Sequence, residues 1–263
     1  MGKTENKKNY EQWTVVAETY HDIRPIPPTV IIKIILSWLK RSPDIVVDVG
    51  CGTGLSTTIW KDVAKKTIGI EPNDEMRNIA QNNVNSDHIV FKKGFSNELN
   101  LTSNYADVIT VSQAFHWFDI DSTLLEFQRV LKKDGILAIY DFELPPIFGW
   151  EIEKSFLELR KKCSEIYYAK ENPPVLNDKN TYHDKIKSFG GFRHSREIMC
   201  YGAEKYTLQR TMDFILNISN APFAMDNDEA IEKDIDDLFN LIKAKYDEEL
   251  EIIFPYKMVI AVK

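Results

Sequence analysis

The strongest constraint in this sequence is an apolar run that carries an acid near its end and then breaks into alternating glycines. The run covers residues 45–49 with Asp48 inside it, and the glycines are Gly50, Gly52 and Gly54. An apolar run of this length is typical of a buried strand. Glycines allow backbone conformations and a close approach to a ligand that a Cβ would prevent. The pattern therefore predicts a buried strand that feeds a ligand-binding loop.

A second acid follows the next apolar run. Residues 67–70 read as a strand, and Glu71 comes directly after it. An acid in this place can accept hydrogen bonds from both ribose hydroxyls of an adenosine. The glycine spacing departs from the dinucleotide pattern, because Leu55 stands where the third glycine would be required. The loop and the acid together favour an adenosine-containing ligand other than a nicotinamide dinucleotide.

Helical and strand-like segments alternate through the first half of the chain, which is the mark of a parallel sheet wrapped by helices. A polar loop with Pro173 and Pro174 and several longer helical segments follow. The sequence Lys132-Lys133-Asp134-Gly135 is expected to close a helix with cations and a glycine. The predicted strands are 45–49, 67–70, 88–91, 106–111, 135–141, 196–201 and 256–262, and the predicted helices are 30–40, 55–64, 74–83, 121–131, 150–168, 182–188, 207–218 and 227–251.

Three motifs resemble a known family. They are Val-Asp-Val-Gly-Cys-Gly-Thr-Gly at 47–54, Gly-Ile-Glu-Pro at 69–72, and the segment 107–118 that ends in Gln-Ala-Phe-His-Trp-Phe. This order resembles the class I S-adenosylmethionine-dependent methyltransferases, specifically the small-molecule branch that includes trans-aconitate methyltransferases. The resemblance is good over residues 10–142 and thin beyond them.

The resemblance implies an α/β fold: a Rossmann-like, mostly parallel seven-stranded sheet with an antiparallel last strand and helical cap insertions. It implies one methyltransferase domain over residues 1–263. Residues 1–142 would form the cofactor-binding core with an N-terminal cover. The blocks 143–181 and 203–251 would be cap insertions that bind the acceptor.

S-adenosylmethionine is the implied cofactor, and it suits the glycine loop. Asp48 can pair with its ammonium group directly or through water, or can cap the following turn. Glu71 can accept from the ribose or can be a solvated charge. The predicted cofactor residues of these two motifs are Asp48, Gly50, Cys51, Gly52, Thr53, Gly54, Glu71, Pro72 and Met76.

Two later patches complete the predicted cofactor site. Phe95 stands where the family usually has an acid, so we expect it to contact adenine or to belong to the core, and Ser96 to offer a hydrogen bond. Gln113, Ala114 and Phe115 follow a strand and so lie at its carboxyl end, where open sheets bind ligands.

Three residues are candidates for catalysis or for the methionine carboxylate. His116 can contact the substrate or transfer a proton, or can be a structural histidine. The segment from Trp13 to Pro25 resembles the family's cover over the cofactor. Within it, Tyr20 would lie near the transferred methyl group, and Arg24 would either grip the methionine carboxylate or be a surface arginine.

The predicted function is methyl transfer from S-adenosylmethionine to a small-molecule acceptor, at an oxygen such as a carboxylate or hydroxyl. A catalytically silent S-adenosylmethionine-binding module is an alternative. An NAD(P)-dependent oxidoreductase is less favoured, because the glycine spacing is wrong and no Tyr-x-x-x-Lys pair is recognisable. The oligomeric state is not predicted.

Composition narrows the partners. The net charge of −7 argues against a sequence-independent nucleic-acid binder. The most apolar run, 30–39, is short and holds Lys33, which argues against a membrane span. The cysteines, Cys51, Cys163 and Cys200, lack paired spacing, so we expect a cytoplasmic protein with no disulfide framework and no metal site.

Overall fold

The computed structural model describes residues 17–171 and 175–263, and among them seven strands form one sheet in the order β3-β2-β1-β4-β5-β7-β6. The predicted loop at Pro173-Pro174 and the start of the predicted cover, from Trp13 to residue 16, lie outside the described residues. The strands are β1 (Ile45–Val49), β2 (Lys66–Ile70), β3 (Ile89–Lys92), β4 (Ala106–Ser112), β5 (Leu131–Phe142), β6 (His194–Thr207) and β7 (Glu249–Val262).

The sheet is parallel from β3 to β5, and β7 then runs antiparallel to both β5 and β6. The central strands β1 and β4 are almost continuously buried and rich in valine and isoleucine, as expected for parallel strands covered on both faces. The predicted Rossmann-like sheet with an antiparallel last strand is therefore confirmed.

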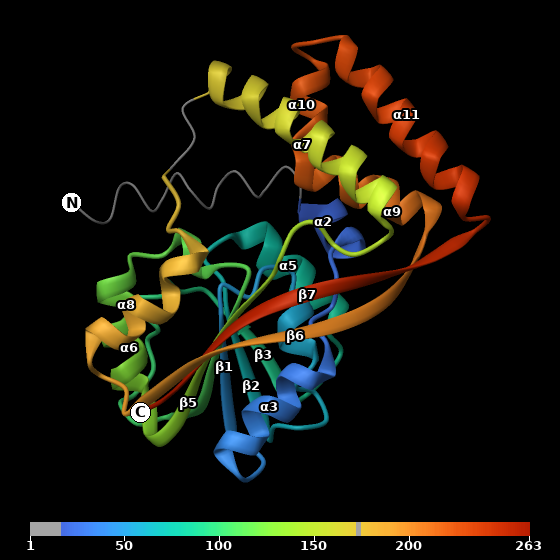
Figure 1. Cartoon of the computed structure of the whole chain (residues 1–263). Helices are drawn as coiled ribbons and strands as arrows, with labels where there is room; N and C mark the ends of the chain where they lie inside the picture. The colour runs from blue at the N-terminus through green and yellow to red at the C-terminus, as the bar shows by residue number, and fades with distance from the viewer. Residues whose placement is uncertain (1–16, 172–174) are drawn as a thin grey trace.

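Helices cover both faces of the sheet (Figure 1). One buried cluster joins α3 and the helices α7, α9, α10 and α11 to one face, and a second joins α6 and α8 to the other. The helices are α2 (Ala17–Ile23), α3 (Thr29–Leu39), α4 (Leu55–Thr58), α5 (Asp74–Asn83), α6 (Ile120–Val130), α7 (Trp150–Lys170), α8 (Tyr182–Phe189), α9 (Leu208–Ser219), α10 (Ala221–Met225) and α11 (Ala230–Lys245).

Side-chain caps fix where three of the helices begin. Asn73 accepts a hydrogen bond from the Met76 amide at the start of α5, and Asp119 accepts one from Ser122 at the start of α6. Thr207 does the same for α9, where the long strand β6 ends. Each cap satisfies an amide that the first helical turn leaves without a partner. The cap of α5 lies shortly after the end of β2, and the cap of α9 is the last residue of β6, so these two caps also fix how the chain leaves those strands.

The predicted helix 55–64 is wrong in length, because α4 ends at Thr58. The chain continues through turns in which Trp60 donates to the Thr57 carbonyl and Lys61 to the Thr58 carbonyl. The sequence here includes three consecutive β-branched residues, which disfavour a regular helix. Trp60 is fully buried, so packing of this ring replaces further helical turns.

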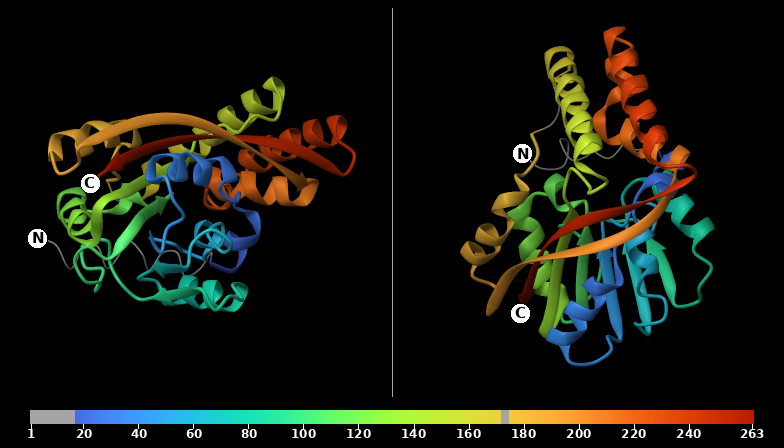
Figure 2. Two further views of the ribbon diagram at one scale, coloured as in Figure 1. Left: turned by 90° about the horizontal axis from the view of Figure 1, so that it is seen from below. Right: turned by 45° about the vertical axis from the view of Figure 1, so that its right-hand side comes forward.

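The second half differs most from the predictions. Strands β6 and β7 are 14 residues each, far longer than the predicted 196–201 and 256–262. They pair along their whole length, from His194 with Val262 to Thr207 with Glu249, and their far ends reach α9 and α11 (Figure 2). The predicted helix 227–251 is therefore wrong at its end, because residues 249–251 belong to β7 and α11 ends at Lys245.

At the end of the sheet where β1 and β4 begin, the buried carboxylate of Asp107 accepts hydrogen bonds from four donors. Asp107 is fully buried, and its oxygens accept from the Arg41 guanidinium (2.6 Å), the Lys132 ammonium (2.9 Å) and the amides of Asp44 (2.9 Å) and Ile45 (2.8 Å). These donors outweigh burial and hold the pKa of Asp107 below its usual value.

The predicted helix end at Lys132–Gly135 is wrong: α6 ends at Val130, and Lys132 lies in β5.

We expect Asp107→Asn to lower the free energy of unfolding by about 2–4 kcal/mol, because all four partners are donors and an amide nitrogen would face one of them. Denaturant titration measures this loss. Asp134→Asn is the matched control, since Asp134 makes an exposed ion pair with Arg193 and has a left-handed φ that asparagine tolerates. The control should lose less than about 1 kcal/mol. Equal losses in the two variants would contradict the role given to Asp107.

No helix in the described part of the chain is both long and apolar enough to cross a membrane.

Candidate active site

A cavity opens at the carboxyl ends of β1, β2, β4 and β5. It encloses about 1160 Å³ including its open mouth, which is ample for a nucleoside-sized ligand. Its walls come from the N-terminal segment, the glycine loop and the loops after β2, β3 and β4. The predicted site residues that line it are Tyr20, Arg24, Gly50, Cys51, Gly52, Thr53, Glu71, Pro72, Met76, Phe95, Ser96, Gln113 and Ala114.

The glycine loop needs its glycines for different reasons. Gly50, Gly52 and Gly54 all have positive φ, of 69°, 53° and 87°. A Cβ at Gly50 would lie 2.6 Å from the Ala114 Cβ, so the loop and the turn after β4 are in direct contact there. Gly52 lines the cavity, and a Cβ added there would meet no atom within 4 Å. Glycine at position 52 therefore leaves room for a ligand against the backbone.

Asp48 lies beneath the loop and not at the cavity wall. Its side chain is fully buried and accepts three hydroxyl hydrogen bonds, from Ser56 (2.7 Å), Thr57 (2.7 Å) and Thr110 (2.8 Å). Burial raises the pKa of this carboxyl, and the three hydroxyls work against that rise. Asp48 thus ties β1 to β4 and to the first turn of α4. Its predicted contact with an ammonium group stays a prediction.

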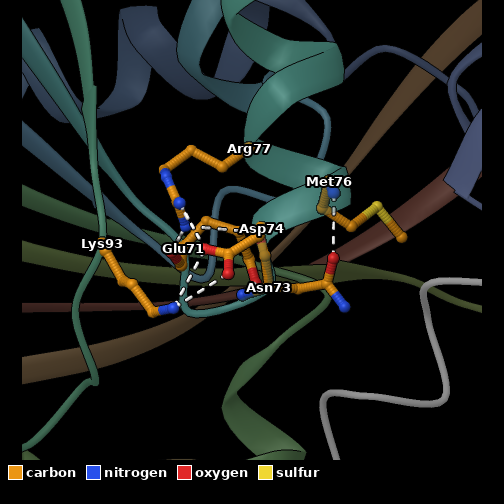
Figure 3. Close-up of polar contacts among 6 residues, drawn as sticks. All are labelled: Glu71, Asn73, Asp74, Met76, Arg77 and Lys93. Carbon is orange, nitrogen blue, oxygen red and sulfur yellow. Dashed lines mark hydrogen bonds and ion pairs between the residues drawn. The ribbon is translucent and has the colours of Figure 1, made fainter.

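Glu71 extends the site to the end of β2 (Figure 3). Its side chain is buried, and its two carboxylate oxygens accept from the amides of Gly52 (3.0 Å) and Asn73 (2.8 Å). Each oxygen retains a further lone pair for a ligand. The carboxylate is thus held against the glycine loop, in the place predicted for a ribose acceptor.

Nearby cations do not neutralise Glu71. Lys93 donates to both carboxylate oxygens of Asp74 at 3.0 Å, and Arg77 pairs with the same carboxylate (Figure 3). Arg77 reaches Glu71 only at its backbone carbonyl, at 3.1 Å. Burial therefore prevails and raises the pKa of Glu71 to about 7, although the two amides and Arg77 lower it. The carboxylate is poised to titrate near neutral pH.

Arg24 brings a positive charge to the cavity from the segment after α2. Its guanidinium donates to the Asn217 side chain of α9 at 2.9 Å and lies 4.7 Å from the centre of the Tyr20 ring. Its Nε is buried without a hydrogen-bond partner among the described residues. Two aromatic rings and one amide hold the guanidinium in place, and Phe142 is the second ring.

Of the four predicted site residues in the turn after β4, two line the cavity and two do not. Gln113 has a left-handed φ of 54° and lines the cavity together with Ala114. Phe115 and His116 do not line it. Phe115 is fully buried and packs edge-on against Tyr182, with ring centres 4.9 Å apart.

His116 is mostly enclosed, and three influences act on it. Burial, followed by the charges of Lys179 and Arg24, lowers the pKa of His116 to about 3. The imidazole is therefore neutral at pH 7, and its Nδ1 has no hydrogen-bond partner among the described residues. Its predicted role as a proton-transfer group stays a prediction.

Of the remaining predicted residues, all except Gly54 line the cavity. Ser96 shares a hydrogen bond with Thr123 at 2.8 Å, and Phe95 and Met76 also belong to the wall. Cys51 is buried, and burial together with the charges of Glu71 and Asp48 raises the pKa of its thiol. The thiol is therefore neutral and suits a packing role. Gly54 does not line the cavity but contacts Phe91 and Ala80 closely.

Several wall residues were missed by sequence reasoning. Phe142 stands at the carboxyl end of β5, and the rule that singled out Gln113 at the end of β4 could have found it. Asn217 and Lys179, which contact Arg24 and Gln113, carry no signal in the sequence. Trp117 and Phe118, the aromatic residues that end the motif 107–118, also line the cavity, where aromatic faces suit a sulfonium. Further lining residues that were not assigned a role are Pro25, Pro27, Val49, Leu55, Ser56, Gly94 and Ser112.

This chain is similar in sequence to proteins that are described as methyltransferases. Residues 47–139 match the family described as "Methyltransferase domain". The chain is 30% identical over 132 residues to a "Putative methyltransferase" of Dictyostelium discoideum, a match that covers 50% of this chain and 49% of that protein. It is 27% identical over 146 residues to the "Probable S-adenosylmethionine-dependent methyltransferase CRG1" of Saccharomyces cerevisiae, covering 54% and 48%. The chain thus spans about half the length of these relatives.

The fold has a close structural counterpart. "The Structure of a Putative Type II Methyltransferase from Anaeromyxobacter dehalogenans" superposes with a TM-score of 0.73 at 15% identity, over 91% of this chain and 97% of that one. The segment from β1 to β5 is similar to methyltransferase domains. The Saccharomyces relative is named as a protein that depends on S-adenosylmethionine.

The pKa of Glu71 yields a prediction about pH. Only the ionised carboxylate accepts from both ribose hydroxyls, so affinity for 5′-methylthioadenosine, which lacks the amino acid head, should rise about tenfold from pH 6 to pH 8. Glu71→Gln should abolish this rise. Calorimetry at each pH measures both. A rise that persists in Glu71→Gln would assign the titration to another group, such as Asp141, whose pKa burial raises to about 6.

Proposed function

We propose that this protein transfers a methyl group from S-adenosylmethionine to an oxygen of a small-molecule acceptor, in the small-molecule branch that includes trans-aconitate methyltransferases. The observation that carries the proposal is the contact between the two cofactor motifs. The Gly52 amide donates to the Glu71 carboxylate, and both residues line one cavity. A loop with a glycine at every second position and an acid at the next strand end suit a nucleoside ligand without a pyrophosphate.

The residues present fit this cofactor. Glu71 would accept from the ribose hydroxyls, and Phe95, Ser96, Met76 and Pro72 would surround the adenine. Gly52 leaves the space that a Cβ would fill. Three polar atoms without hydrogen-bond partners among the described residues, Arg24 Nε, Gln113 Nε2 and Thr53 Oγ1, belong to side chains that line the cavity. We assign Arg24 and Gln113 to the methionine head.

Methyl transfer is a direct displacement, so its main demand is alignment of nucleophile, methyl carbon and sulfur. Alignment alone can supply about 7–11 kcal/mol. The aromatic residues Tyr20, Trp117, Phe118 and Phe142 line the cavity and suit a sulfonium cation, which the faces of aromatic rings attract. Tyr20, which stacks on Arg24, is the residue that we place near the transferred methyl group.

The state of His116 bears on the acceptor. With a pKa of about 3, the imidazole is a weak base and is a poor match for taking a proton from a hydroxyl. A carboxylate acceptor is already ionised at neutral pH and needs no base. His116 also does not line the cavity, so a carboxylate, which needs no base, is the acceptor that we propose.

We propose that the helical blocks after residue 143 select the acceptor. The support is that α9 reaches the cavity residues from above: Asn217 holds Arg24, and Phe214 packs against Phe142 with ring centres 6.1 Å apart. Two aromatic residues of these blocks, Trp150 and Phe223, do not line the cavity. Trp150 is 72% exposed, and Phe223 packs on Tyr167.

We further propose that the protein acts in the cytoplasm, where its free cysteines, Cys51, Cys163 and Cys200, would remain reduced.

Calorimetry should detect binding of S-adenosylmethionine and of S-adenosylhomocysteine, with little binding of NAD. Glu71→Ala should weaken both cofactor complexes about 10- to 100-fold, the loss of one or two charge-assisted bonds. Circular dichroism confirms that the variant is folded. Tighter binding of NAD than of S-adenosylmethionine would favour the oxidoreductase alternative.

Mixtures of metabolites incubated with protein and S-adenosylmethionine should contain a species that gains one methyl group, seen by mass spectrometry. The gain should require both components and should be absent with Glu71→Ala at low cofactor concentration. Tight cofactor binding without any methylated product across carboxylate-rich mixtures would favour the catalytically silent module.

A further inference from the structure

A short segment, Asn177–Asn180, is fastened across the turn that carries the cavity residues after β4. We call it the strap. The Asn177 amide donates to the His116 carbonyl at 3.0 Å, and its side-chain nitrogen donates to the Phe118 carbonyl at 2.8 Å. Lys185 donates to the Asn177 side-chain oxygen at 3.0 Å. The two bonds to His116 and Phe118 therefore hold the strap against the turn after β4.

Lys179 of the strap reaches two strand ends at once. Its ammonium donates to the Gln113 side-chain oxygen at 3.2 Å and lies 3.8 Å from a carboxylate oxygen of Asp141. Gln113 follows β4 and Asp141 lies near the end of β5. The Asp141 side chain is 4% exposed, and Lys179 is the only cation within ion-pair distance of it among the described residues.

The contact with Lys179 decides which way the Gln113 amide faces. An ammonium group can only donate, so the oxygen of the amide must point toward it. The amide nitrogen is then turned away, and it is buried without a hydrogen-bond partner in the described part of the chain. The backbone of Gln113 is fixed as well, because its amide donates to the Tyr140 carbonyl at 3.2 Å. A buried N–H pair in this state calls for an acceptor on the ligand.

The charges nearby indicate an anionic acceptor. Arg24 lines the same cavity, and its guanidinium lies 5.8 Å from the ring of Phe142, the residue next to Asp141. Lys179 is paired with Asp141, so Arg24 is the cation that faces the cavity, and a neutral donor on the same cavity wall suits a carboxylate. The opposite side of the cavity, at Glu71, holds a carboxylate of its own and would repel one.

We propose that Lys179 is a positioning residue, which holds the Gln113 amide so that its nitrogen donates to the carboxylate of the methionine head of the cofactor. This inference rests on the proposed function, because it takes S-adenosylmethionine as the ligand. Lys179 acts through Gln113 and does not itself touch the ligand. The strap, which follows α7 in the chain, would thereby contribute to binding of the cofactor through Gln113.

The test compares two ligands by calorimetry: S-adenosylhomocysteine, which has the amino acid head, and 5′-methylthioadenosine, which lacks it. Lys179→Met should weaken the first roughly 5- to 20-fold and change the second less than about twofold. Lys179→Arg, which restores a donor, should recover most of the loss. Lys187→Met is the control, because Lys187 is an exposed lysine of α8 outside the strap, and it should leave both affinities within about twofold.

A double-mutant cycle separates positioning from other roles. In a Gln113→Ala background, Lys179→Met should cause less than about twofold further loss, because the residue through which Lys179 acts is gone. The same cycle in an Asp141→Asn background avoids leaving a buried carboxylate without its cation, and it keeps the test valid if Lys179→Met alone fails to fold.

Three results would overturn the inference: no effect of Lys179→Met on S-adenosylhomocysteine, equal losses for both ligands, or a full loss that persists without Gln113. The last result would mean that the lysine attracts the ligand by its charge alone. If the unaltered protein bound neither ligand, the proposed function itself would fail, so the two failures are distinguishable.

Discussion

The structure of the site depends on a buried carboxylate that does not itself line the cavity. Asp48 accepts hydrogen bonds from Ser56, Thr57 and Thr110, which joins β1, β4 and the first turn of α4 at one point. With these elements fixed, the glycine loop has one path, and its Gly52 amide meets the Glu71 carboxylate at the end of β2. Replacing water by three hydroxyls offsets the cost of burying the charge. The ligand site is thus built on a satisfied polar centre within an apolar sheet.

The cavity is electrically divided. Glu71 supplies a carboxylate at one side, and the cations that could neutralise it are taken by Asp74. Arg24 lies near the other strand ends, with Lys179 behind Gln113. A ligand with hydroxyls at one end and a carboxylate at the other would be oriented by this division before any specific contact forms. Such a ligand is what the methionine-linked adenosine proposed as cofactor would present.

The end of β6 and the start of α9 hold the N-terminal segment that carries Arg24 to the cavity. Tyr206, near the end of β6, donates to the Ile23 carbonyl at 3.0 Å, and Arg210 of α9 donates to the carbonyls of Asp22 (2.8 Å) and Arg24 (3.0 Å). The segment that carries Arg24 is therefore shaped by residues far along the chain. Under the proposed function, changes in α9 would therefore affect binding of the cofactor through Arg24 as well as selection of the acceptor.

Local sequence determined the positions of the parallel strands and of the loops that follow β1, β2 and β4. The strand and glycine loop at 45–54, the acid at Glu71 and the residues after β4 are signals of backbone conformation and burial, and these depend on neighbours in the chain. Tertiary structure decided the rest. Residues 249–251 continue a helical pattern in sequence, but pairing with β6 makes them strand. Asp48, predicted as a ligand contact, is enclosed by three hydroxyls, one of them from β4. Lys179 and Asn217 meet Gln113 and Arg24 only because the chain folds back over the sheet, and no local pattern encodes contacts between residues so distant in sequence.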